Sequence, residues 1–332
     1  MPIHMKKLSN KQWAWLVTLV VGVSVFLFWS YRYPFALTYQ EQLQLFLFDG
    51  DYFIDRLSEP GGLARYVAEF LVQFYNGVAI GAAIIAVLYM LIQRLTWRLM
   101  KVKSHYILSF IPVSMLWFAM CDESVMLTYA VALVMALAVM IAWNKLAPQN
   151  TVVKVAAVVG LIPVLYWLIG PIVLMVAVWM MPLSVIYALA LMLLSAHYLP
   201  FPMMRVMLGI SYYRIPVTLP YVLMAIPVVV LLLGWLTKRL PEPKTWVLTG
   251  EALLLAVLVV VPQQFGFDAK KYELMEYDYL VRIGDWNDII AKAEKKTPDL
   301  PMSVSATNLA LAMTNQLGDK AFDFFQRGSE GL

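Results

Sequence analysis

A short polar stripe lies where the second apolar run of the chain begins. Arg65, Glu69, Gln73 and Asn76 are spaced by four, four and three positions, so a helix would place them on one face. Polar side chains that enter a membrane face protein or a water-filled cavity rather than lipid. The stripe therefore either joins neighbouring helices, with Arg65 paired to Glu69, or forms a site in which Arg65 binds the phosphate of an anionic substrate.

Carboxylates gather in the polar segment before this stripe and in a short acidic turn further along. Glu41, Asp51 and Asp55 lie between residues 39 and 59, and Asp122 and Glu123 form the turn. Glu41 or one of the Asp residues would serve as a general base toward an acceptor. We group Asp55 with the four residues of the stripe as substrate-binding. Asp122 and Glu123 either bind a divalent cation through oxygen or form a solvated turn that caps the next helix.

These residues belong to a chain dominated by apolar runs. It is 62% hydrophobic and 14% charged, well below the charge of a soluble domain. Because every backbone amide in lipid must be bonded within its own segment, the runs predict an all-α, polytopic transmembrane bundle. Each is near or above the roughly 20 residues that span a bilayer, and they lie at about 12–31, 67–94, 105–121, 125–146, 152–169, 171–197, 220–237 and 246–263.

The basic residues predict the topology. Three lysines before residue 12 put the N-terminus in the cytoplasm, and we expect a multi-pass protein of the bacterial inner membrane. About eight spans put the C-terminal tail inside, whereas seven or nine put it outside. Residues 198–219, with Arg205 and Arg214, should lie inside, opposite the first loop. The basic residues between 238 and 244 conflict with eight spans. Either this late loop tolerates them outside, or the count is off by one element, through a broken or re-entrant helix around Pro182 or a half-span within residues 198–219.

Two polar segments complete the predicted organisation. The first outside loop has apolar residues at helical spacing, which predicts a helix lying in the interface over about 38–58, within a membrane domain of residues 1–264. The second segment is a soluble tail over 265–332. In it, Gly284 and Gly318 stand 34 positions apart and each precedes Asp, which resembles the period and turn of a tetratricopeptide repeat, although Pro298 comes about three residues early.

Such repeats bind protein partners, so residues 268–332 are a candidate partner surface. A solenoid needs about three repeats, and this tail has fewer than two. We therefore expect either that the chain is incomplete at residue 332 or that the repeat packs on the membrane domain.

The acidic residues and the loop helix together resemble the GT-C class of membrane glycosyltransferases. That resemblance covers about residues 10–147 and implies a polyprenyl-phosphate-linked sugar as donor. It also implies Glu41 as the catalytic base, with Asp51 second, and Asp122 and Glu123 as a second acidic motif. The stretches 59–64 and 284–286 are also similar to a bacterial family of multi-spanning proteins with a tetratricopeptide-like tail, which implies no activity.

Other functional classes lack their signatures. The net charge of +4 lies mostly at helix ends, so membrane lipids rather than nucleic acid are the expected contact. No Walker loop, zinc spacing or nucleophile elbow is present. Two hypotheses remain: a lipid-linked-sugar glycosyltransferase at the outer face, and a non-catalytic membrane scaffold whose tail binds partners.

Overall fold

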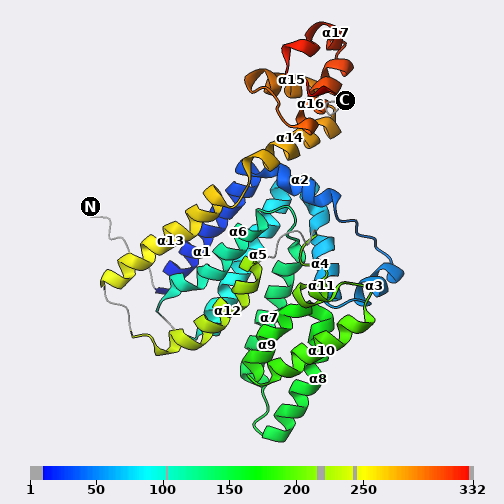
Figure 1. Ribbon diagram of the computed structural model, residues 1–332. Coiled ribbons are helices and arrows are strands. Elements are labelled where there is room, and N and C mark those ends of the chain that lie inside the picture. Colours follow the sequence, from blue (N-terminus) through cyan, green and yellow to red (C-terminus); the bar gives the residue numbers. More distant parts are fainter. Residues whose placement is uncertain (1–9, 102–103, 215–220, 242–244, 329–332) are drawn as a thin grey trace, which may run out of the picture.

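The computed structural model describes residues 10–101, 104–214, 221–241 and 245–328, and all regular elements in these residues are helices (Figure 1). Five stretches are long and apolar enough to cross a membrane, and a bent pair, Thr249–Phe265 with Ala269–Ile283, would make a sixth. The predicted helical, membrane-type class is therefore confirmed. The five stretches are Gln12–Arg32, Val78–Met100, Leu127–Leu146, Tyr221–Arg239 and Thr151–Met180, the last of which is divided by a reversal of the chain at Gly170.

One large apolar core holds the helices before the tail together. Within it α5 packs against α1 and α7, and α6 packs against α12 and α13. In chain order the elements are α1 (Asn10–Leu27), η1 (Phe28–Arg32), α2 (Pro34–Gln42), α3 (Gly50–Leu57), α4 (Gly62–Val72), η2 (Gln73–Asn76), α5 (Val78–Met100), η3 (Tyr106–Phe110), α6 (Ile111–Met120), α7 (Leu127–Leu146), α8 (Thr151–Ile169), η4 (Gly170–Ile172), α9 (Val173–Met180), α10 (Ser184–Tyr198), α11 (Met203–Leu208), α12 (Tyr221–Leu236), η5 (Thr237–Arg239) and α13 (Thr245–Phe265).

Several predicted spans differ from the helices observed. The run expected over 67–94 is interrupted by η2, and its long helix begins at Val78. The run expected over 105–121 forms only a short apolar helix, Tyr106–Met120. The run expected over 171–197 is divided into α9 and α10 around Pro182, because the residue before a proline disfavours the helical conformation and Met181 is extended, with φ −159° and ψ 115°.

The chain doubles back between α8 and α10. Tyr166 of α8 lies 2.9 Å from Ser195 of α10, and Tyr187 of α10 donates to the carbonyl of Val159 over 3.2 Å. Later residues of one helix meet later residues of the other, so α8 and α10 run in the same direction. The reversal begins at Gly170, whose backbone angles of φ 73° and ψ −156° are not helical. The short α9 therefore returns toward the start of α8, and α10 ends on the face where α8 ends.

The helix ends lie on two faces of the bundle, and one hydrogen bond identifies each face. On one, the Tyr33 hydroxyl donates to the carbonyl of Cys121 over 3.0 Å, beside the acidic turn; we call this the acidic-turn face. On the other, a ring nitrogen of His105 lies 2.9 Å from the carbonyl oxygen of Pro241. We call it the lysine face, because α5, α7 and η5 end there beside basic residues.

Residues 198–214 lie on the acidic-turn face, so their predicted placement opposite the first loop is wrong. The N–H of Met126 donates to the carbonyl of Tyr212 over 2.9 Å, and the N–H of Arg214 donates to that of Ser124 over 2.6 Å. The physical reason is the reversal between α8 and α10, which hydropathy cannot distinguish from a full crossing. Residues 215–219 of that predicted loop lie outside the described residues.

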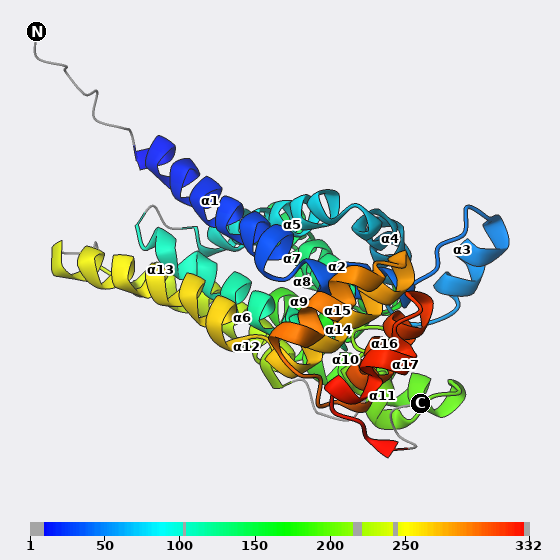
Figure 2. The ribbon, with the colours of Figure 1, turned by 90° about the horizontal axis from the view of Figure 1, so that it is seen from above.

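The first loop is not one helix over 38–58. It consists of α2, an irregular segment over 43–49, and α3 (Figure 2). The irregular segment places Phe46 in an aromatic cluster, with its ring centroid 4.9 Å from that of Tyr66 and 5.5 Å from that of Phe70. Burial of this ring competes with helix formation, because a continuous helix would hold the segment away from α4.

The tail has its own small apolar core and contacts the acidic-turn face (Figure 1). It contains α14 (Ala269–Ile283), α15 (Trp286–Lys295), α16 (Pro301–Met313), α17 (Leu317–Lys320) and η6 (Ala321–Asp323). Gly284 ends α14 in the left-handed conformation, but Gly318 lies inside α17, and the left-handed residue after α16 is Asn315. The two glycines of the 34-residue echo are thus not equivalent, and the repeat assignment stays a prediction.

The turn at the end of α8 requires glycine at position 170. Gly61 of the first loop and Tyr212 of the segment 198–214 both pack against it. The φ and ψ of Gly170 lie in a region that is essentially restricted to glycine, and an added Cβ would lie 2.9 Å from the Tyr212 hydroxyl. We expect Gly170→Ala to lower the free energy of unfolding by about 1–3 kcal/mol. Thermal unfolding in detergent would measure the loss.

Gly160 provides the matched control for this substitution. It lies inside α8 with nothing within 4 Å of an added Cβ. Gly160→Ala should leave the melting temperature unchanged or raise it, because alanine favours helix more than glycine does. Equal melting temperatures for the two variants would contradict a strained turn at Gly170.

Candidate functional site

A polar cavity of about 310 Å³ opens on the acidic-turn face. It lies where α4 and the start of α7 meet the first loop and the segment 201–214. We call it the arginine cavity. Its lining residues are Leu43, Gln44, Glu59, Arg65, Glu69, Met126, Thr128, Phe201, Arg205, Ile210, Ser211, Tyr213 and Arg214.

Glu69 is the buried charge at the base of this cavity. Its side chain is 7% exposed, and its two carboxylate oxygens accept from Nε of Arg65 over 2.9 Å and from Nε of Arg56 over 2.7 Å. The Tyr52 hydroxyl donates to it as well. Burial, followed by this hydrogen bond, raises the pKa of Tyr52 to about 12. One carboxylate thus joins α3 to α4 and leaves few lone pairs for any ligand.

The second carboxylate of the cavity is less saturated. Nη1 of Arg65 donates to Oε2 of Glu59 over 3.0 Å, and each side chain is 26% exposed. No hydrogen bond to Oε1 of Glu59 is found among the described residues. Glu59 is therefore the cavity carboxylate with an oxygen free to accept a proton from a bound molecule.

Arg205 and Arg214 add positive charge without a matching carboxylate. Arg205 donates to the carbonyl oxygens of Ile210, over 3.2 Å, and of Arg214, over 3.4 Å. In the described part of the chain neither arginine forms an ion pair with Asp or Glu. Together with Arg65, three arginines line the cavity against two glutamates, so its lining carries net positive charge. Guanidinium groups match the geometry of phosphate oxygens.

Gln44 supplies a further unsatisfied polar group. It is 8% exposed, and within the described residues its Nε2 donates only to the sulfur of Met126, over 3.4 Å. Its Oε1 is buried with no hydrogen-bond partner among the described residues. A buried amide oxygen without a partner costs free energy, so this position favours a bound donor such as a hydroxyl group.

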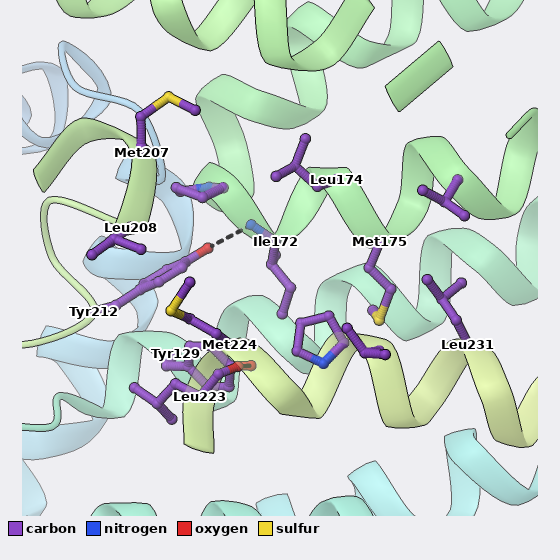
Figure 3. A pocket seen from close by; sticks show the side chains of 14 residues that line it. Tyr129, Ile172, Leu174, Met175, Met207, Leu208, Tyr212, Leu223, Met224 and Leu231 are labelled. Atoms are coloured by element: carbon purple, nitrogen blue, oxygen red, sulfur yellow. Dashed lines mark hydrogen bonds between the residues drawn. The ribbon is translucent and has the colours of Figure 1, made fainter. Parts of the chain in front are cut away.

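An apolar groove of about 270 Å³ lies beside the arginine cavity. Ile172 and Met175 approach it from the η4–α9 side, and Met224 and Leu231 approach it from α12 (Figure 3). Tyr212 closes one end, where its hydroxyl accepts from the N–H of Ile172 over 3.3 Å.

The structure separates the predicted site residues. Of the polar stripe, Arg65 and Glu69 pair and line the cavity. Gln73 and Asn76 do not line it, because η2 ends the helical face at residue 73. The Nε2 of Gln73 is buried without a partner in the described residues, and Asn76 is exposed.

The predicted catalytic carboxylates also lie outside the cavity lining. Glu41 is half-buried at the end of α2, and Asp51 is exposed on α3. Asp55 is exposed, and one of its carboxylate oxygens lies 2.7 Å from Nη1 of Arg56. Arg56 also pairs with Glu69, so Asp55 is linked to Glu69 only through this arginine.

The acidic turn is used for local structure and for tail contact. Asp122 accepts from the N–H of Ser124 over 2.8 Å and from its hydroxyl, so it closes the turn locally, whereas α7 begins after Met126 without a side-chain cap. Glu123 accepts from Nζ of Lys271 over 2.7 Å, and this hydrogen bond raises the pKa of Lys271. Among the described residues no group of three or more His, Cys, Asp or Glu side chains could hold a metal ion.

Sequence reasoning did not assign Glu59 to the site and placed Arg205 and Arg214 on the wrong side. Glu59 stands one residue before the Pro60-Gly61-Gly62 turn, and this position could have indicated a side chain held beside the start of α4. The two arginines carry a phosphate-binding signal, but only the fold brings them to the first loop.

Fold and cavity define the chain as an all-helical, membrane-type protein with a positively charged cavity on one face. The chain belongs to a family of unknown function, DUF6057, whose model matches residues 9–332. No curated protein and no solved structure matches the chain.

The Glu69 cluster yields a prediction about stability. Glu69→Gln removes the charge that compensates Arg56 and Arg65, and breaking a buried ion pair from one side costs about 3–5 kcal/mol. We expect a correspondingly lower free energy of unfolding in a detergent-solubilised denaturation series. Asp51→Asn is the control, because Asp51 is exposed and surface changes stay within about 0.5 kcal/mol. Equal stability of the two variants would contradict the role given to Glu69.

Proposed function

We propose that this chain is an integral-membrane glycosyltransferase, similar to the GT-C class, that uses a polyprenyl-phosphate-linked sugar at the outer face of the membrane. The observation that carries the proposal is the arginine cavity, in which Arg65, Arg205 and Arg214 converge from two separate segments. A phosphate would complete the charge balance that the cavity carboxylates leave unmet.

The proposal includes a topology. Seven crossings, made by α1, α5, η3–α6, α7, α8, α12 and α13, would leave α9 and α10 as a re-entrant hairpin. The N-terminus would be cytoplasmic, and the acidic-turn face and the tail would be outside, at the bacterial inner membrane. The positive-inside rule supports this, since the basic residues of the lysine face then fall on the cytoplasmic side. They include Arg98, Lys101, Lys145, Lys154, Lys238 and Arg239.

The residues of the cavity fit the transfer step. Glu59 would take the proton of the acceptor hydroxyl, whose oxygen then bonds to the anomeric carbon of the sugar. The bond between that carbon and the phosphate oxygen breaks, and the phosphate leaves with the electron pair. Arg65, Arg205 and Arg214 would stabilise the charge that develops on it. The GT-C-like pattern gave the base role to Glu41, but Glu59 is the carboxylate with a free oxygen in the cavity.

A substitution of Glu59 tests this function directly. In a strain that lacks the gene, we expect the wild-type chain to restore a sugar-containing product that Glu59→Gln lowers at least ~100-fold, the usual minimum for loss of a general base. The variant should still bind polyprenyl phosphate, because the arginines are retained. Mass spectrometry of the extracted glycans would measure the product.

Glu41→Gln is the matched control, and it should restore the product fully. A loss with Glu41→Gln alone would return the base role to Glu41. Identical glycans in the wild-type and deletion strains would contradict the glycosyltransferase proposal.

The topology predicts which positions a membrane-impermeant thiol reagent reaches. Asp51→Cys in α3 and Asp319→Cys in the tail should label in intact spheroplasts, whereas Lys145→Cys should label only after permeabilisation. All three positions are exposed, and Cys121 is buried, so background labelling should be low. Labelling of Asp319→Cys only after permeabilisation would place the tail inside and exclude seven crossings.

The alternative function is a membrane scaffold whose tail binds a protein partner. One observation favours it: Phe322, at 91% exposed, and Phe325, at 53%, leave aromatic surface uncovered at the end of the tail. Contiguous exposed apolar patches mark interaction sites, and these two aromatic rings would form part of such a patch. Full restoration of function by Glu59→Gln, together with its loss on Phe322→Ser, would favour the scaffold over the enzyme.

A further inference from the structure

The arginine cavity and the apolar groove share one wall. The segment 203–213 and the first turn of α7 line both hollows. Arg205, Tyr213 and Thr128 line the cavity. Met207, Tyr212 and Tyr129 line the groove. A molecule with an anionic end and an apolar end would therefore meet both environments around a single short segment.

The polar atoms of the groove are already satisfied. The Tyr129 hydroxyl donates to the carbonyl of Leu223 over 2.6 Å, and the Tyr212 hydroxyl contacts the carbonyl of Ile169 and accepts from Ile172. The rest of the lining is apolar, with Met and Leu side chains that adapt to irregular shapes (Figure 3). An occupant thus needs no hydrogen-bonding groups, which suits a hydrocarbon.

The groove also opens where a lipid could enter. Met224 is 48% exposed and Val228 is 55% exposed, so its rim along α12 reaches the outer surface of the helix bundle. These residues lie in the part of α12 nearer the acidic-turn face, because α12 begins at Tyr221 and ends at the lysine face. A chain in the groove would lie in the same half of the membrane as a phosphate in the cavity.

We infer that the groove holds the hydrocarbon chain of the lipid whose phosphate occupies the arginine cavity. This inference rests on the proposed function for the phosphate site and adds a second binding site to it. One groove beside one cavity suits a phosphate that carries a single long chain. Because bilayer and groove are both apolar, the groove contributes through shape and packing rather than through the hydrophobic effect.

Adjacent leucines on α12 allow a matched test. Leu231 lines the groove, whereas Leu232 is exposed and does not. Binding to the purified full chain would be measured with two probes, a long-chain polyprenyl phosphate and isopentenyl phosphate. We expect Leu231→Trp to weaken the long-chain probe at least ~10-fold and to leave isopentenyl phosphate unchanged. Leu232→Trp should affect neither probe, and Arg205→Gln should weaken both.

The two parts of the argument fail separately in this experiment. If Leu231→Trp binds the long-chain probe as the wild type does, while Arg205→Gln weakens both probes, the chain does not lie in the groove and the phosphate site stands. If Arg205→Gln changes neither probe, the proposed function fails.

Photo-crosslinking on the wild-type chain guards against a misfolded variant. A polyprenyl phosphate with a diazirine on its chain should crosslink to peptides that contain residues 171–178 and 223–231. Crosslinks confined to other helices would overturn the inference without any substitution.

Discussion

The buried carboxylate of Glu69 is the constraint on which the candidate site depends. An ionised group this far from water must be paired, and the chain pairs it with an arginine from α3, an arginine from α4 and a tyrosine hydroxyl. The pairing holds α3 against α4, the helix on which α3 mainly packs, and α3 otherwise stands at the edge of the bundle (Figure 2). It also orients Arg65, whose second nitrogen then reaches Glu59 and the cavity. Fold stability and site geometry thus share one ion-pair network.

The other wall of the site depends on a topological feature rather than on a charge. Because α8 and α10 run in the same direction, the chain delivers residues 198–214 to the acidic-turn face, where backbone hydrogen bonds hold them against residues 124–126. Gly170 permits the reversal, and Tyr212 packs on it. Arg205 and Arg214 therefore reach the first loop only because a segment long enough to cross instead turns back.

This difference explains what the sequence could and could not predict. The helical class and the Arg65–Glu69 pair follow from local periodicity, which does not require knowledge of the partner helices. Gln73 and Asn76 were assigned to the same face by that rule, but a 3₁₀ turn rotates residues by a different angle and removes them from it. Arg205 and Arg214 were misplaced because hydropathy measures how apolar a segment is and not where it ends.

The two glutamates of the cavity have different chemical capacities, and this bears on any reaction there. Glu69 accepts hydrogen bonds from two guanidinium groups and a tyrosine hydroxyl, so both of its oxygens are already used to hold neighbouring side chains. Glu59 shares only one oxygen with Arg65 and is partly exposed to the cavity. Proton transfer requires an accessible lone pair close to the reacting hydroxyl, and Glu59 is the more exposed of the two and has an oxygen without a hydrogen-bond partner among the described residues. The arrangement therefore separates a carboxylate that holds the arginines in place from one that is free to act.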